Sequence, residues 1–141
     1  MRIIYAFPYL HIIYVFPDAF IQYKKNKKGN MQTIIIKTDE SWKIVNQADF
    51  SLENYQEIVG GWVEYVHIYD DIAILCNEEG KIKGLPVNML ITQYIKSKKP
   101  FNDVICGDVI FTKTDEEGED APLSMNEIND VIDFIELYQN S

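Results

Sequence analysis

Residues 77–88 form the segment of this chain whose residue types are best suited to a functional site. The segment follows an apolar run, turns, and then places a glycine, a proline and an asparagine within five positions before a helix-like stretch. Ordinary surface loops seldom use these special backbone residues so closely together. The candidate binding residues of this region are Asn77, Glu78, Lys81, Gly84, Leu85, Pro86 and Asn88, together with Trp62.

The end of this segment combines an apolar knuckle with a polar group. Leu85 and Val87 flank Pro86, and the preceding Gly84 allows a backbone or a ligand to approach closely. Asn88 presents an amide at the start of a helix, where free N–H groups attract carbonyl or anionic groups. A purely structural interpretation is equally open, with glycine for a left-handed turn, proline to fix the chain direction and asparagine as the helix cap.

The other reactive side chains favour structural roles. Glu78 and Glu79 are adjacent, so their carboxylates point in different directions, and no spaced set of metal ligands accompanies them. The acidic loop 115–120 lacks the alternating oxygen ligands and the closing glutamate of an EF-hand. His67 has no serine or cysteine at a recognisable spacing. We therefore expect no catalytic residue, no metal ligand and no cofactor, and favour a protein that is not an enzyme.

Composition narrows the possible functions further. The chain has 13 basic and 22 acidic side chains and a net charge of -9, so nonspecific binding to nucleic acid phosphates is not expected. Cys76 and Cys106 each lie within an apolar run, where a free cysteine behaves as a small hydrophobic residue. We expect both thiols to be buried and reduced, with a disulfide or a reactive pair as the alternative.

The first 30 residues differ in composition from the rest of the chain. They are rich in aromatic and aliphatic residues, and the pattern of residues 3–8 recurs in residues 12–17. The Lys-Lys-Gly-Asn sequence before Met31 requires purine-rich codons that resemble a bacterial ribosome-binding site. We therefore expect translation to start at Met31 and residues 1–30 to be a non-native upstream extension.

Two alternatives for the first 30 residues stay open. A membrane anchor needs about 20 predominantly apolar residues, but His11, Asp18 and two prolines interrupt this stretch. A signal peptide would carry its basic residues before the apolar region, whereas most of them follow it here. The first 30 residues hold five of the 13 basic and one of the 22 acidic side chains. Residues 31–141 therefore carry eight basic and 21 acidic side chains, a net charge of -13.

Residues 31–141 are predicted to form a single acidic α+β domain. Strand-like apolar runs cover residues 33–37, 62–69, 72–76 and 104–112, and the second and third of these are expected to form a hairpin. Helix-like stripes follow Ser51, Asn88 and Ser124, each of which can act as an N-cap. The order β-α-β-β-α-β-α matches a small antiparallel or mixed sheet, with a ferredoxin-like (split βαβ) arrangement and an additional C-terminal helix as one possibility.

Four blocks in this order carry a family resemblance. They are Leu52 with residues 55–64, then residues 76–81, residues 84–88 (Gly-Leu-Pro-Val-Asn) and residues 103–108 (Asp-Val-Ile-Cys-Gly-Asp). Together they resemble the domain-of-unknown-function family 3846 over about residues 31–138. The resemblance implies a protein encoded by bacteriophages or mobile elements of bacteria, with a start near Met31. It implies no activity and no catalytic residue.

Three functions of different classes agree with the sequence. We favour a non-enzymatic, cytoplasmic protein-binding module, an accessory protein that contacts an unknown host or phage protein through its acidic surface and the Trp62 region. The second function is a DNA mimic, in which carboxylates of the last helix and the acidic loop imitate phosphates and inhibit a host nuclease or restriction system. The third is a small-molecule binder or enzyme centred on residues 77–88, which requires a concave pocket containing Asn88 and a titratable group. No contact with a membrane is expected if the chain starts at Met31.

Overall fold

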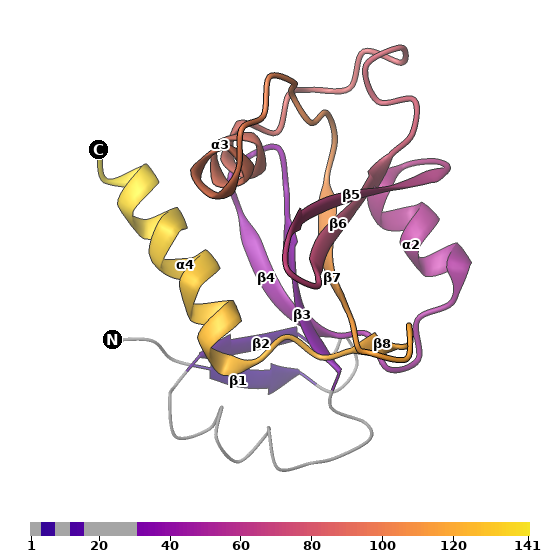
Figure 1. Cartoon of the computed structure of the whole chain (residues 1–141), viewed down its shortest axis with the longest axis vertical. Coiled ribbons are helices and arrows are strands. Elements are labelled where there is room, and N and C mark those ends of the chain that lie inside the picture. Colours follow the sequence, from indigo (N-terminus) through magenta and orange to yellow (C-terminus); the bar gives the residue numbers. More distant parts are fainter. Residues whose placement is uncertain (1–3, 8–11, 16–30) are drawn as a thin grey trace.

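The computed structural model describes residues 4–7, 12–15 and 31–141, and the first two of these ranges only as backbone (Figure 1). The described strands are β1 (Ile4–Phe7), β2 (Ile12–Val15), β3 (Gln32–Ile36), β4 (Trp42–Asn46), β5 (Val63–Tyr69), β6 (Ile72–Asn77), β7 (Val109–Thr114) and β8 (Asp120–Ala121). The described helices are α2 (Leu52–Val59), α3 (Met89–Lys98) and α4 (Met125–Gln139).

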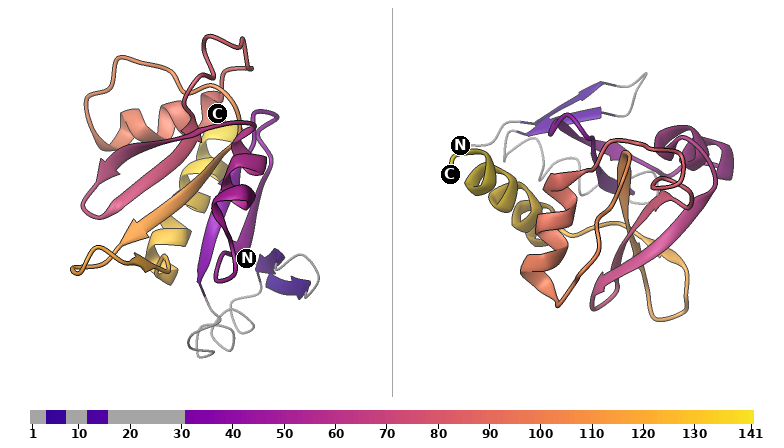
Figure 2. Two further views of the ribbon diagram at one scale, coloured as in Figure 1. Left: turned by 90° about the vertical axis from the view of Figure 1, so that its right-hand side faces the viewer. Right: turned by 90° about the horizontal axis from the view of Figure 1, so that it is seen from above.

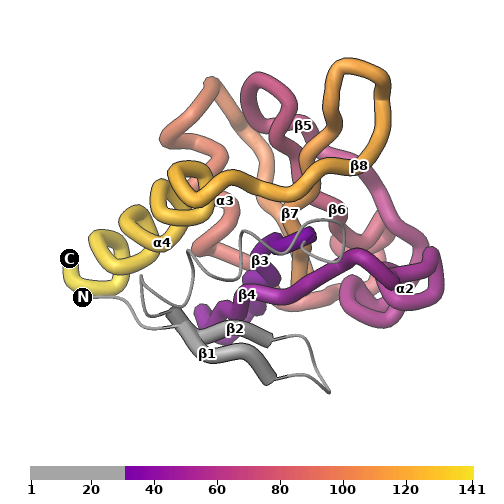
Figure 3. The backbone as a smooth tube through the Cα atoms, turned by 90° about the horizontal axis from the view of Figure 1, so that it is seen from below, coloured from indigo at the N-terminus to yellow at the C-terminus, as the bar shows by residue number. Residues whose placement is uncertain are grey.

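The described strands form one antiparallel sheet in the order β1-β2-β4-β3-β7-β6-β5, and β8 pairs with the end of β7. Helix α2 covers one face of this sheet, whereas α3 and α4 cover the other face (Figures 2 and 3). Strand β5 therefore ends the sheet on one side. Among the described residues, no helix has the length and apolar composition that a membrane span requires.

The core beneath α3 and α4 is the larger of the two cores. Tyr94 of α3 lies at its centre, and its ring makes edge-to-face contacts with Phe111 of β7 and Phe134 of α4 at centroid distances of 5.6 and 5.4 Å. The Tyr94 hydroxyl donates a hydrogen bond of 2.8 Å to the carboxylate of Asp130. Aromatic packing therefore joins α3 to the sheet and α4 to α3, and Asp130 of α4 makes polar contacts with both Tyr94 and Lys98 of α3.

The core beneath α2 is smaller. Its buried members are Ile35, Val45 and Ile110, and Tyr55 and Ile58 of α2 pack against them. Ser51 caps this helix in a capping box with Asn54, and Gly60, with a φ of 83°, ends it in a left-handed conformation. The start of α2 therefore lies where the sequence predicts it.

The predicted α+β class is confirmed, but the sheet is not ordered as in a ferredoxin-like fold. In that arrangement the first predicted strand, β3, would lie between β7 and β6, whereas here β7 lies between β3 and β6. Strand β4, which forms a hairpin with β3, was not predicted from the sequence. Because a strand has only two edges, and β4 occupies one edge of β3, β3 is left with a single edge for β7.

One predicted strand has a different start. The run 104–112 is strand-like in sequence, but β7 begins only at Val109. Gly107 has a φ of 95° and Cys106 makes only an isolated bridge to Val87, so residues 104–108 form an irregular connection. The Leu85 side chain packs closely on Gly107, because a Cβ at this position would lie 3.0 Å from it.

Candidate functional site

The segment 77–88 is joined to the end of α2 by a buried asparagine. Asn77 is 5% exposed. Its side-chain amide donates a hydrogen bond of 3.1 Å to the carbonyl of Val59, and its side-chain oxygen accepts a hydrogen bond of 2.7 Å from the N–H of Glu79. The N–H of Glu78 bonds the carbonyl of Trp62 at 2.8 Å. Asn77 therefore holds the exit of β6 against the loop that precedes β5.

A second buried asparagine joins three parts of the chain. The Asn88 side chain is fully buried, and its amide donates hydrogen bonds to the carbonyls of Ile36, at 3.1 Å, and Gly107, at 3.0 Å. Its side-chain oxygen accepts a hydrogen bond of 3.3 Å from the N–H of Ile91 and so caps α3, as the sequence predicted. The amide protons and the oxygen are thus engaged within the protein, which gives Asn88 a structural role.

Close backbone contacts complete this region. A Cβ on Gly80 would lie 2.7 Å from the carbonyl oxygen of Cys106, so only glycine allows the two segments to approach this closely. The N–H of Gly107 donates a hydrogen bond of 2.8 Å to the carbonyl of Pro86. Gly84, with a φ of 70° and no atom within 4 Å of its Cβ position, serves the turn alone. We call residues 59–62, 77–88 and 105–108 the corner.

A cleft of about 310 Å³ opens beside the corner. The last turn of α2 (residues 57–60) lines one side, Leu85 and Pro86 line another, and Thr38, Gly107 and Asp108 complete it. Asp108 accepts a hydrogen bond of 3.0 Å from the N–H of Thr38. Leu85 and Pro86 are the two predicted binding residues that line this cleft, whereas the fully buried Asn88 does not.

The charged residues predicted in the segment lie at the surface. Lys81 forms an exposed ion pair with Asp103; this hydrogen bond raises the pKa of Lys81 and lowers the pKa of Asp103. Lys83 lies 3.5 Å from the carboxylate of Glu79. Glu78 is exposed. Exposed pairs of this kind contribute little stability, so they do not by themselves identify a site.

The remaining predicted residue, Trp62, lies beside the edge of the sheet. Trp62 is 62% exposed, and Tyr65 of β5, which the sequence analysis did not single out, is 53% exposed. The edge is closed farther along, because Lys99 contacts the carbonyl of His67 and the pairing with β6 shifts between His67 and Tyr69. The accessible edge therefore covers residues 62–66.

Other reactive groups have structural surroundings. The ring of His67 lies 2.8 Å from the carbonyl oxygen of Asp70. Residues 115–119 form an exposed turn in which Asp115 accepts hydrogen bonds of 2.9 Å from the N–H groups of Glu117 and Glu119. In the part of the chain that the structure describes, no three histidine, cysteine or acidic side chains converge as a metal site would require.

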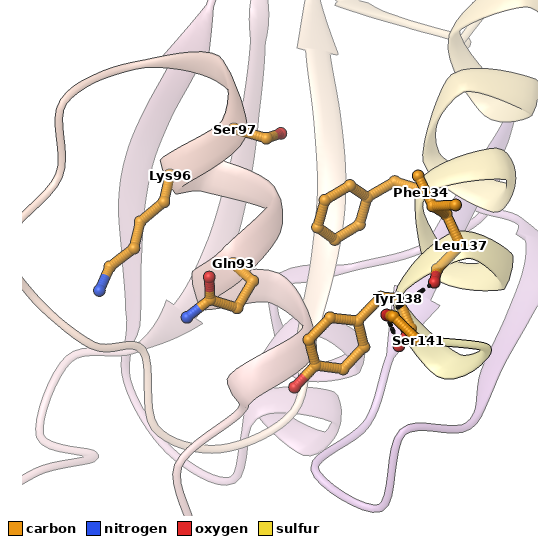
Figure 4. A pocket seen from close by; sticks show the side chains of 7 residues that line it. All are labelled: Gln93, Lys96, Ser97, Phe134, Leu137, Tyr138 and Ser141. Carbon is orange, nitrogen blue, oxygen red and sulfur yellow. Dashed lines mark hydrogen bonds between the residues drawn. The ribbon is translucent and has the colours of Figure 1, made fainter.

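A second hollow, of about 380 Å³, lies between α3 and α4 (Figure 4). Phe134, Leu137 and Tyr138 line it from α4, and Gln93 and Lys96 line it from α3. Leu137 is 72% exposed. This groove was not predicted, because the carboxylates of the last helix indicate an acidic outer face, whereas apolar side chains follow α4 past its last buried residue, Ile135.

These observations define an antiparallel α+β domain in which two buried asparagines and closely packed glycines hold one corner together. The chain belongs to the family described as Domain of unknown function (DUF3846), whose model matches residues 31–138. The match confirms the resemblance and the extent predicted for it. No curated protein and no solved structure matches the chain.

Proposed function

We propose that the protein is a non-enzymatic binding module that captures an extended segment of a host or phage protein at the edge of β5. The observation that carries the proposal is the edge at residues 62–66, with which no further described strand pairs, together with the exposed rings of Trp62 and Tyr65. The phage or mobile-element setting rests on the family resemblance. An added strand is a common way for proteins to bind extended peptides.

The backbone of β5 has the correct phase for an added strand. The bond from the N–H of Glu78 to the carbonyl of Trp62 makes residues 62 and 78 a hydrogen-bonded pair. In an antiparallel ladder such pairs alternate, so Glu64 also bonds β6, whereas Val63 and Tyr65 turn their N–H and C=O groups away from it. The outward N–H and C=O groups of Val63 and Tyr65 can thus form hydrogen bonds with a partner strand.

The side chains offer different contacts on the two faces. Glu64 is opposite Cys76, which lies in the core beneath α3 and α4, so Trp62 and Glu64 are assigned to that face. Tyr65 is opposite Leu75, which packs beneath α2. Exposed tryptophan and tyrosine are frequent energetic centres of interfaces. The net charge of -9 favours association with a neutral or basic partner.

The two alternative functions have less support. DNA mimicry needs unpaired carboxylates on the last helix, but Glu127 and Asp130 of α4 lie 3.0 and 2.8 Å from Lys113 and Lys98. A small-molecule site centred on residues 77–88 would use Asn88, whose side chain is fully buried and hydrogen-bonded within the protein. We therefore favour the protein-binding module.

A proline substitution tests the added strand directly. Val63→Pro removes one outward N–H and leaves the bonds to β6 intact, because residue 63 does not donate to β6. Val63→Ala is the matched control, since it also shortens the side chain but keeps the N–H. We expect a partner captured from carrier or infected cells by the control to be lost with Val63→Pro, and also with Trp62→Ala combined with Tyr65→Ala.

Affinity for the identified partner decides the outcome. Loss of two aromatic anchors should weaken binding by about 30-fold or more. Circular dichroism and thermal melting confirm that each variant is folded. If Val63→Pro and Val63→Ala bind the partner equally well, the partner does not add a strand to β5.

A further inference from the structure

The cleft beside the corner has an electronegative lining. Two acidic residues line it from separate elements, Glu57 from the last turn of α2 and Asp108 from the loop before β7. None of the described residues that line it is a lysine or an arginine. Lys83 of the corner lies beside Gly61 and is paired with Glu79. The lining therefore carries negative charge without a compensating cation of its own.

The end of α2 adds to this potential. The N–H groups of Gly60 and Gly61 both bond the carbonyl of Gln56, so the carbonyls of Glu57 and Ile58 lie beyond the last helical hydrogen bond. The negative end of a helix dipole lies at these carbonyls, and the last turn of α2 contains no basic residue. A cation in the cleft would face both the carboxylates and this helix end.

The walls of the cleft are fixed. One oxygen of Asp108 accepts the N–H of Thr38, which orients the carboxylate and leaves the second oxygen for another donor. Leu85 packs so closely on Gly107 that a Cβ there would lie 3.0 Å from its side chain. Leu85, Pro86 and Ile58 give the cleft apolar surface next to these charges. A ligand with an aliphatic stem and a cationic head matches this combination.

We infer that the cleft binds a guanidinium group, as carried by an arginine side chain. A guanidinium is planar, offers paired donors to carboxylates and loses hydration more readily than an ammonium. A volume of about 310 Å³ is at the lower limit for ligand pockets and suits one side chain. The source is either an arginine of another protein or free arginine. This inference is independent of the proposed strand addition at β5.

Titration of the full chain with a matched pair of probes tests the inference. The probes are N-acetyl-L-arginine amide and N-acetyl-L-citrulline amide, which have nearly the same shape but differ in charge. In ¹H–¹⁵N spectra at physiological salt, we expect saturable shifts of the Gly60, Gly107 and Asp108 amides with the arginine probe only. Equal shifts with both probes, or shifts spread over the acidic surface, would overturn the inference.

Substitutions assign the effect to the cleft. Glu57→Gln and Asp108→Asn keep the size of each side chain, and the asparagine oxygen can still accept the Thr38 N–H. Together they should weaken the binding of the arginine probe by about tenfold or more. Glu53→Gln is the control, because Glu53 is exposed one turn earlier on α2 and does not line the cleft. If the double variant is unfolded, Glu57→Gln alone provides the test. Unchanged binding of the arginine probe by this single variant would contradict the inference.

Free L-arginine distinguishes the two sources of the guanidinium. If free arginine binds more tightly than the blocked probe, the α-amino and carboxylate groups contribute and the ligand is the free amino acid. If the blocked probe binds as well or better, the ligand is an arginine within a protein chain. Absence of localised shifts with either form would refute the guanidinium site itself.

Discussion

At the scale of single residues, buried amides hold the corner together. Asn77 and Asn88 are 5% and 0% exposed, and each connects segments that lie far apart in the sequence. A buried amide is tolerated only when its groups are hydrogen-bonded, and both side chains meet this condition. These two residues were predicted as binding residues, and the structure shows what they already bind within the chain.

Asn88→Ala should lower the free energy of unfolding by about 3 to 5 kcal/mol, because it removes the α3 cap and the two buried hydrogen bonds to the carbonyls of Ile36 and Gly107. Asn88→Asp separates these causes. Aspartate caps helices well, but it cannot donate to Ile36 and Gly107, so we expect it to be at least as destabilising as alanine. Urea unfolding measures both.

The control for the asparagine variants is Asn126→Ala, an exposed position on α4 that should change stability by less than about 0.5 kcal/mol. If Asn88→Asp were nearly as stable as the unmodified protein, the helix cap alone would account for the contribution of Asn88 to stability. The two bonds to carbonyls would then contribute little.

At the scale of elements, a charged contact joins α4 to the sheet. Glu127 closes the capping box of α4 with Ser124 and also lies 3.0 Å from Lys113 of β7. Burial alone would raise the pKa of Glu127, but the hydrogen bonds from Ser124 and the ion pair with Lys113 outweigh it and lower the pKa. The ionised form is therefore favoured in the folded state.

A lowered pKa gives a definite pH dependence. The stabilisation from Glu127 is present above its ordinary pKa of 4.5 and is lost as the pH falls through the lower value of the folded state. We expect Glu127→Gln, which still completes a capping box, to be less stable at pH 7 by at most about 1 kcal/mol. This difference should disappear near pH 3 in urea unfolding. A difference that stayed constant with pH would show that charge is not its cause.

At the scale of the whole molecule, both cysteines are free and buried, as the sequence predicted. Burial, with smaller contributions from Glu64 and Cys106, raises the pKa of Cys76 to about 12. Because only the thiolate attacks disulfides, Cys76 should be unreactive while the protein is folded.

The two thiols thus report on opening of the molecule. We expect negligible reaction with an aromatic disulfide reagent at pH 7 in the absence of denaturant, and reaction of both thiols in urea. The rate should rise with urea in parallel with the fraction of unfolded protein. Rapid modification of the folded protein would show that the core opens locally or that a thiol is activated.

The predictions that proved correct depend on neighbouring residues. The caps Ser51, Asn88 and Ser124 bond N–H groups three residues ahead, so the starts of all three described helices follow from local sequence. The hairpin of β5 and β6 needs only two adjacent apolar runs and a turn. The missed strand β4 is short, and the polar residues on both sides of its apolar centre weaken the strand pattern.

The sequence by itself determined the α+β class, the starts of the helices, the buried thiols and the family, because these depend on local hydrogen bonds, apolar periodicity and ordered blocks of residues. Only the tertiary structure decided that β7 separates β3 from β6, and that the amide of Asn88 reaches Ile36 across 52 positions. It also decided that Glu57 and Asp108 line one cleft. Such contacts depend on which strand edges remain free after each pairing, and no local pattern encodes that choice.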